Sequence, residues 1–246
     1  MPELIVNVLA SSKDVSQIAI GNILGSNIAN ILLILGVAAF IYPIIIKQST
    51  VFYEIPYSII ALLLVTFLAN SNFWGSNPNA IYQTDGILLM AFFGLFVAYI
   101  IKLAKNGKAD IIDEVSHAEI TTTKSVFMIV FGMVGLFFGG QWVVDGAIVA
   151  ANNFGLSKAF IGLTVVAIGT SLPELVTSAV AAYKKNTDIA MANVIGSNIF
   201  NLLWVLGISA IIKPVEFDPK LNVDVFILVG ACLLYTSPSP RDPIGS

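Results

Sequence analysis

The segment PELIVNVLASSKDVSQIAIGNILGSNIANILLILGVAAFIYP, residues 2–43, aligns without a gap to residues 173–214. The matching positions are mostly polar residues, glycine and proline, which chance rarely repeats in an apolar chain. They are Pro-Glu-Leu at 2–4 and 173–175, Gly-Ser-Asn at 25–27 and 196–198, and the pairs Asn22 and Asn193, Asn30 and Asn201, Gly36 and Gly207, and Pro43 and Pro214. An internal repeat of this kind indicates two structurally equivalent units.

The composition is that of a membrane protein. Hydrophobic residues make up 57% of the chain and charged residues 11%, with a mean hydropathy of +0.89, which is too apolar for a water-exposed surface. Windows of about 20 residues give apolar stretches at roughly 17–46, 51–70, 82–103, 125–151, 158–183, 188–212 and 223–235. We therefore predict an all-α, polytopic transmembrane helical bundle in a lipid bilayer. The single cysteine excludes an internal disulfide, and the absence of a basic run gives no sign of nucleic-acid binding.

Five helices lie between one Pro-Glu-Leu and the next, and an odd number makes the two repeats run in opposite directions. Such inverted repeats, with an ion site near the midplane, are a transporter architecture. We divide the chain into a first membrane repeat at 1–103, a linker at 104–124, a second membrane repeat at 125–235 and a non-native tail at 236–246. The short first and last apolar segments predict a bundle truncated at both ends, since a span needs about 20 residues.

Loop charges predict the orientation. If loops alternate sides, one side collects Lys13, Lys158, Lys213 and Lys220, and the other collects Lys47, Lys102, Lys105, Lys108, Lys124, Lys184 and Lys185. The positive-inside rule makes the second side cytoplasmic. The connection 104–124, which holds His117 and several acids, then faces the cytoplasm. We interpret it as a solvated linker rather than a regulatory metal site, because its acids lack the spacing of a calcium loop.

The stretch GTSLPEL at 169–175 carries the strongest functional signal. Glu174 lies inside the apolar stretch 158–183, where an ionised carboxylate costs several kcal/mol unless it is paired or hydrated. Pro173 lacks an N–H and frees carbonyls one turn earlier, and Thr170 and Ser171 add hydroxyl oxygens. Hard cations such as calcium and sodium prefer such all-oxygen sets. The alternative is a protonated glutamate that only hydrogen-bonds neighbouring helices.

A second signal follows each Pro-Glu-Leu. Asn193, Ser197 and Asn201 are spaced i, i+4, i+8, which lines one helix face with oxygen-bearing side chains that could face Glu174. The alternative is a tight helix-packing motif built on the small residues Gly196 and Ser197. Asn198 falls off this stripe, and we expect it to serve packing. The recurrence of the stripe in both repeats favours the ligand interpretation.

With these two motifs in two inverted repeats, residues 1–235 resemble the calcium:cation antiporter superfamily, particularly the prokaryotic sodium/calcium exchangers. The resemblance implies a secondary active antiporter, not an enzyme, that exchanges calcium for sodium by alternating access and needs no cofactor. It also implies that this chain lacks the first helix, part of the second and the end of the exchanger. The expected location is a prokaryotic inner membrane, with calcium and sodium ions as substrates.

The resemblance further implies a set of ion ligands. Glu3 and Glu174 match the two glutamates that bind calcium and sodium, and Ala167 matches a backbone carbonyl ligand. The other matching positions are Thr170 and Ser171, the two serines Ser26 and Ser197, and Asn30 and Asn201. Two departures stand out: the first repeat lacks the GTSL part before Pro2, and Asn201 stands where some exchangers have aspartate.

Other functions stay open at this point. A proton- or potassium-coupled calcium exchanger would use closely related residues. A cation channel is less favoured, because channel pores are built around an oligomer axis or a filter loop. A non-transporting membrane protein would not need midmembrane carboxylates.

Overall fold

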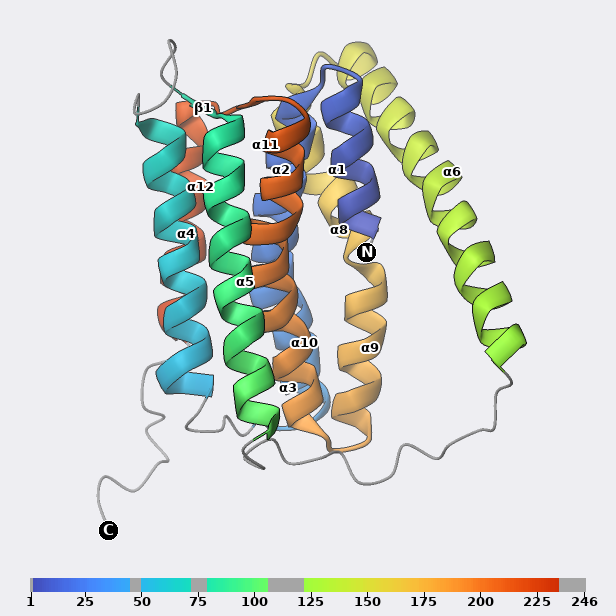
Figure 1. Ribbon diagram of the computed structural model, residues 1–246. Helices are drawn as coiled ribbons and strands as arrows, with labels where there is room; N and C mark the ends of the chain where they lie inside the picture. The colour runs from blue at the N-terminus through green and yellow to red at the C-terminus, as the bar shows by residue number, and fades with distance from the viewer. Residues whose placement is uncertain (1, 45–49, 72–78, 106–121, 235–246) are drawn as a thin grey trace.

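The computed structural model describes residues 2–44, 50–71, 79–105 and 122–234 (Figure 1). Within these residues, five helices are long and apolar enough to cross a membrane, and a sixth candidate span is a helix pair bent by 46°. The helices lie at Ser16–Ile41, Thr50–Asn70, Gln83–Leu103, Thr123–Phe154 and Thr187–Ile212, and the bent pair joins Lys158–Thr170 to Leu172–Tyr183. Helices satisfy their own backbone hydrogen bonds, as lipid requires. The predicted all-α membrane fold is therefore confirmed.

The elements follow one another in a simple order. The chain begins with α1 (Pro2–Ser12), α2 (Ser16–Ile28), η1 (Ala29–Ile34), α3 (Leu35–Ile41), η2 (Thr50–Glu54), α4 (Ile55–Asn70), strand β1 (Ala80–Ile81), α5 (Gln83–Lys105) and α6 (Thr122–Phe154). It continues with α7 (Lys158–Ile161), η3 (Gly162–Val166), α8 (Ala167–Thr170), α9 (Leu172–Tyr183), α10 (Thr187–Ile199), η4 (Phe200–Val205), α11 (Leu206–Ile212), strand β2 (Val215–Glu216), η5 (Pro219–Leu221) and α12 (Asn222–Leu234). Most of the predicted linker and the whole predicted tail lie outside the described residues.

Two π-helical segments occupy equivalent positions in the two repeats. η1 interrupts the helix that begins as α2, and η4 interrupts the helix that begins as α10. Each contains one asparagine of the predicted ligand set, Asn30 in η1 and Asn201 in η4. A π segment takes one more residue per turn than an α-helix, so it re-aims the side chains that it carries, and such segments are frequent at functional sites.

The two repeats run in opposite directions. In Figure 1, α1 rises from the middle of the bundle, whereas its repeat counterpart α9 descends from the middle. Likewise α2 descends toward α3 while α10 rises toward α11. The inverted arrangement predicted from the odd number of helices is thus visible in the fold, and it brings the two Pro-Glu-Leu segments to the same level of the bundle.

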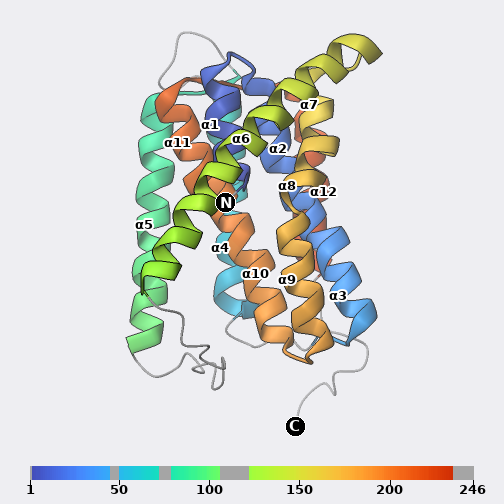
Figure 2. The same cartoon turned by 90° about the vertical axis from the view of Figure 1, so that its right-hand side faces the viewer.

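Close backbone contact joins the repeats. A Cβ added to Gly25 of α2 would lie 2.1 Å from the carbonyl oxygen of Leu163 in η3, and one added to Gly21 would lie 2.4 Å from that of Ala159 in α7. Only glycine permits this approach. A further glycine contact joins α6 to α1. Gly140 of α6 lies against the side chain of Ile5 in α1, and Figure 2 shows α6 crossing α1 obliquely.

Polar contacts fasten one end of the bundle. Lys13, after α1, pairs with Asp145 of α6 at 2.6 Å, and Asp14 pairs with Lys213 at the end of α11. Strands β1 and β2 pair antiparallel and join the segment before α5 to the segment after α11. This sheet was not predicted from the sequence, because two-residue strands show no alternation of apolar and polar residues.

Candidate functional site

Two carboxylates from opposite repeats line one cavity in the middle of the bundle. Glu3 of α1 and Glu174 of α9 both border a cavity of about 320 Å³. The rest of its lining comes from α10 and η4: Ala192, Asn193, Gly196, Ser197, Phe200 and Asn201. Four of the predicted ligands, the two glutamates with Ser197 and Asn201, therefore meet at one place, although they are far apart in the sequence.

A break in the helix presents Glu174. α8 ends at Thr170 and α9 begins at Leu172, with Pro173 and Glu174 in the first turn of α9. Proline is tolerated in a first turn and disfavoured inside a helix, so Pro173 places the break. A first-turn carboxylate interacts favourably with the helix dipole. Oxygen Oε2 of Glu174 is nevertheless buried without a hydrogen-bond partner among the described residues.

Asn193 connects the polar stripe to the glutamate segment. Its side-chain amide donates to the main-chain carbonyl of Glu174 at 3.1 Å and to the hydroxyl of Ser178 at 2.9 Å. The stripe of α10 does face Glu174, as predicted. A Cβ added to Gly196 would meet nothing within 4 Å, so the packing role considered for this glycine is wrong, whereas its counterpart Gly25 does pack closely.

A cluster of hydroxyl and carbonyl oxygens brings together three more predicted ligands. The hydroxyl of Ser26 lies 3.3 Å from that of Thr170 and 3.5 Å from the carbonyl oxygen of Ala167, and the hydroxyl oxygen of Thr170 lies 3.2 Å from the same carbonyl oxygen. Next to them in the chain, the hydroxyl of Ser171 is buried and has no partner among the described residues. These oxygens come from both repeats and surround the helix break.

A relay of amides supports Thr170. Its hydroxyl donates to the Oδ1 of Asn22 at 3.0 Å, Asn22 donates to the Oδ1 of Asn7 at 2.7 Å, and Asn7 donates to the carbonyl of Ala19 at 3.1 Å. The repeat pair Asn22 and Asn193 was recognised in the sequence, whereas Asn7 was not predicted to belong to the site. A polar residue, Ser178, at the equivalent position of the second repeat was the available signal.

Asn30 and Asn201 are buried and hydrogen-bonded across the repeats. Asn30 donates to the Oδ1 of Asn198, and Asn201 donates to the Oδ1 of Asn27. Asn198, which we expected to serve packing, is therefore a polar partner of a predicted ligand. Of the nine predicted ligands, Asn30, Ser26, Ala167, Thr170 and Ser171 do not line the cavity that Glu3 and Glu174 share.

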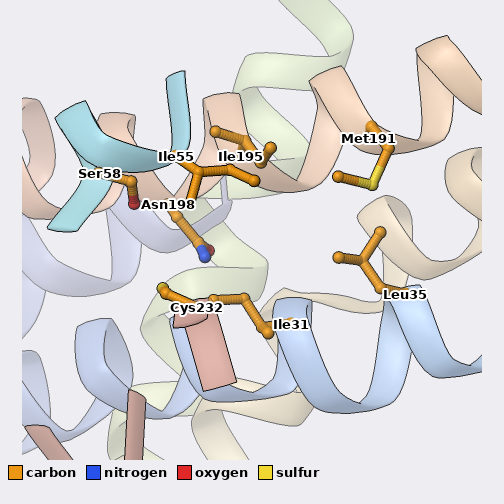
Figure 3. Close-up of a pocket in the computed structure, with 8 residues that line it drawn as sticks. All are labelled: Ile31, Leu35, Ile55, Ser58, Met191, Ile195, Asn198 and Cys232. Atoms are coloured by element: carbon orange, nitrogen blue, oxygen red, sulfur yellow. The ribbon is translucent and has the colours of Figure 1, made fainter. Parts of the chain in front are cut away.

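A second, smaller cavity lies beside Asn198 and has a different character. It measures about 20 Å³, room for one water molecule, and Figure 3 shows it bordered mainly by apolar side chains. Its lining residues are Ile31, Leu35, Ile55, Ser58, Met191, Ile195, Asn198 and Cys232. Its wall contains no carboxylate.

The carboxylate cavity suits a transported cation. Within the part of the chain that the structure describes, no group of three or more His, Cys, Asp or Glu side chains is arranged to hold a metal ion. The site instead combines two carboxylates with hydroxyl, amide and carbonyl oxygens, the ligands that calcium and sodium prefer. Inverted repeats that meet at an ion site near the midplane are an architecture typical of secondary transporters.

Comparison with known proteins defines the family. Residues 1–102 and 124–239 match the profile of the sodium/calcium exchanger protein family. The inner membrane protein YrbG of Escherichia coli is 36% identical to this chain, in an alignment that covers 100% of this chain and 78% of YrbG. The sodium/calcium exchanger MaX1 of Methanosarcina acetivorans is 30% identical, in an alignment that covers 95% of this chain and 77% of MaX1. The solved structure of the sodium-calcium exchanger NCX_Mj matches with a TM-score of 0.64 and 32% identity, covering 96% of this chain and 73% of that one.

The chain belongs to the sodium/calcium exchanger family. It is a multi-pass prokaryotic membrane protein and a cation/calcium antiporter, not an enzyme. The resemblance drawn from the two repeated motifs is thereby confirmed.

Proposed function

We propose that this antiporter exchanges calcium for sodium by alternating access, and that both ions bind at the cavity shared by Glu3 and Glu174. The observation that carries the proposal is the meeting of these two carboxylates, one from each repeat, in one cavity with an unpartnered buried oxygen on Glu174. Sodium as the coupling ion is supported by the names of MaX1 and NCX_Mj, both called sodium/calcium exchangers.

The remaining proposed ligands are two residues of the cavity wall, Ser197 and Asn201, and five that lie outside its lining and would supply further oxygens. Those outside the lining are Ser26, Asn30, Ala167, Thr170 and Ser171. Hydroxyl and amide oxygens suit both ions, and only the carboxylates supply charge. The site needs no cofactor, because the ions themselves are the cargo.

The two carboxylates offer a physical basis for coupling. When the cavity is empty they repel each other, and either one calcium ion or several sodium ions relieve that repulsion. The membrane repeats 1–103 and 125–235 supply one glutamate each, so a relative movement of the repeats would change access to the site. If only the loaded, charge-compensated cavity passes between the outward-open and inward-open states, calcium and sodium movements are coupled.

Calcium uptake into proteoliposomes tests the proposal. We expect radiolabelled calcium to accumulate when an outward sodium gradient is imposed, and Glu174→Gln to abolish this uptake by removing one of the two charges. Glu216→Gln is the matched control, since it makes the same substitution on β2, outside the cavity. Uptake driven by protons or potassium instead would keep calcium antiport and change the coupling ion. No calcium flux under any gradient would refute the proposal.

A further inference from the structure

We propose that Asn27 and Asn198 are positioning residues that determine which end of the Asn201 and Asn30 amides is turned toward the transported ions. This inference rests on the proposed function, in which Asn30 and Asn201 are ion ligands. Asn27 and Asn198 themselves do not contact the ion in this scheme. They act by holding the amide nitrogen of a ligand on the opposite repeat.

The four asparagines form a reciprocal arrangement. Asn201 donates from Nδ2 to the Oδ1 of Asn27 at 3.2 Å, and Asn30 donates from Nδ2 to the Oδ1 of Asn198 at 2.9 Å. Positions 27 and 198 are equivalent in the repeat, as are 30 and 201. We call Asn27 and Asn198 the clamp residues. Each bond therefore joins a proposed ligand of one repeat to the clamp residue of the other repeat. All four side chains are at most 2% exposed, and burial strengthens such bonds relative to bonds made in water.

An asparagine side chain can bind a cation in only one of its two amide orientations, whereas a carboxylate can bind in either. Its side-chain amide carries an oxygen on one arm and an NH₂ group on the other, in nearly the same shape. Only the oxygen can bind a cation, while the amide hydrogens repel it. A site that uses asparagine therefore needs a neighbour that selects the orientation.

The orientation of the Asn201 amide follows from the Oδ1 of Asn27, which can only accept a hydrogen bond. Asn27 donates from Nδ2 to the main-chain carbonyl of Asn198 at 3.3 Å, and this bond commits its nitrogen. The Oδ1 of Asn27 is then left to face Asn201, and an oxygen without hydrogen can only accept. Asn201 must turn its Nδ2 toward Asn27, which leaves its Oδ1 for the cavity that Asn201 borders.

Asn30 makes the equivalent bond, although no hydrogen bond among the described residues fixes the Nδ2 of Asn198 as the Asn198 carbonyl fixes that of Asn27. With the Nδ2 of Asn30 committed to Asn198, the Oδ1 of Asn30 is buried and has no hydrogen-bond partner among the described residues. A buried amide oxygen without a partner is unfavourable, so a cation that binds there restores a missing interaction. The clamp residue Asn198 lies between this ligand and the small apolar cavity, into which its side chain points in Figure 3.

Aspartate at position 201 separates a positioning role from a structural one. A carboxylate has oxygen on both arms, so it presents an oxygen to the ion in either orientation. The clamp should then lose its importance for ion binding. A role of Asn27 in folding alone would change stability and leave the KM for calcium unchanged in both backgrounds.

The experiment is a double-mutant cycle of Asn27→Leu and Asn201→Asp in the reconstituted protein, read as the KM for calcium and the maximal rate of uptake. We expect Asn27→Leu to raise the KM about tenfold with Asn201 in place, as loss of a partner that orients a metal ligand typically does. In the Asn201→Asp background, we expect Asn27→Leu to leave the KM nearly unchanged. The two substitutions are then strongly non-additive.

The control breaks a similar bond elsewhere. Asn70 of α4 and Asn222 of α12 bond each other in both directions at 3.0 Å, away from the ion cavity, and Asn222→Leu should leave the KM at the wild-type value. An unchanged KM in Asn27→Leu, or an equal rise in both backgrounds, overturns the clamp. If Asn27→Leu does not fold, Asn198→Leu against Asn30→Asp makes the same comparison from the other repeat. Wild-type protein without calcium uptake would instead refute the proposed function, and the clamp with it.

Discussion

Asn7 and Ser178 occupy equivalent positions in the two repeats, yet their hydrogen bonds differ in number. Asn7 accepts from Asn22 and donates to the carbonyl of Ala19, so it joins two partners. Ser178 accepts from Asn193, which also reaches the carbonyl of Glu174. Removing Asn7 therefore leaves the buried amide of Asn22 without its acceptor and removes a second bond to the Ala19 carbonyl, which keeps its main-chain partner inside α2. Removing the Ser178 hydroxyl leaves Asn193 with a remaining acceptor.

This difference predicts unequal losses of stability. Asn7→Leu should lower the free energy of unfolding by about 2–4 kcal/mol, because the buried Asn22 amide left without its acceptor costs roughly 1–3 kcal/mol and the lost bond to Ala19 about 1 kcal/mol more. Ser178→Ala should cost about 1 kcal/mol. Thermal melting of the purified protein in detergent measures both variants. Equal shifts would contradict the relay from Ala19 to Thr170.

At the residue scale, the sequence predicted the acids and the stripe but not their supports. Glu3, Glu174, Ser197 and Asn201 were identifiable because apolar surroundings make a polar residue stand out. Asn198 was not, since a helical wheel shows only that it leaves the stripe. Its partner Asn30 lies on a helix of the other repeat, and periodicity within one segment carries no information about contacts between segments.

At the scale of elements, the contact between α2 and η3 depends on glycine. A Cβ at Gly25 would lie 2.1 Å from the carbonyl oxygen of Leu163 and 2.7 Å from the Cβ of Ala167, closer than van der Waals contact allows. Ser26, the next residue, holds the hydroxyl cluster with Thr170. Packing and ligand geometry are therefore linked at this crossing.

We expect Gly25→Ala to force the two helices apart. Overpacking of this kind costs about 1–3 kcal/mol, and calcium uptake should fall because Ser26 moves away from Ala167 and Thr170. The matched control is Gly36→Ala in α3, where a Cβ meets nothing within 4 Å and helix propensity improves. Uptake rates per folded protein compare the two. Full activity in Gly25→Ala would contradict the described crossing.

The positions of the membrane-spanning helices were predicted from the sequence, but the π segments within them were not. Spans of apolar residues gave helix positions to within a few residues, and Pro173 located the break beside Ser171. The π segments η1 and η4 were not predictable, because the residue pattern of a single widened turn hardly differs from that of an α-helix. Their equivalence in the two repeats shows that they belong to the architecture of the site.

At the scale of the whole molecule, charge and topology make a joint prediction about orientation. The helices alternate direction, so the segments that contain Lys184 and Lys220 lie at opposite ends of the bundle (Figure 1). The larger of the two predicted lysine groups includes Lys184, and the positive-inside rule assigns the end of the bundle that holds Lys184 to the cytoplasm.

Labelling of single cysteines tests this orientation. The one native cysteine, Cys232, is buried, and Cys232→Ser provides the background for Lys184→Cys and Lys220→Cys. Both lysines are exposed, and each substitution removes one positive charge from its own side, so the two variants control for each other. In intact cells, a membrane-impermeant maleimide should label position 220 and leave position 184 unlabelled until the membrane is permeabilised. The reverse pattern would place the Lys184 end outside, and the loop lysines would then not set the topology of this exchanger.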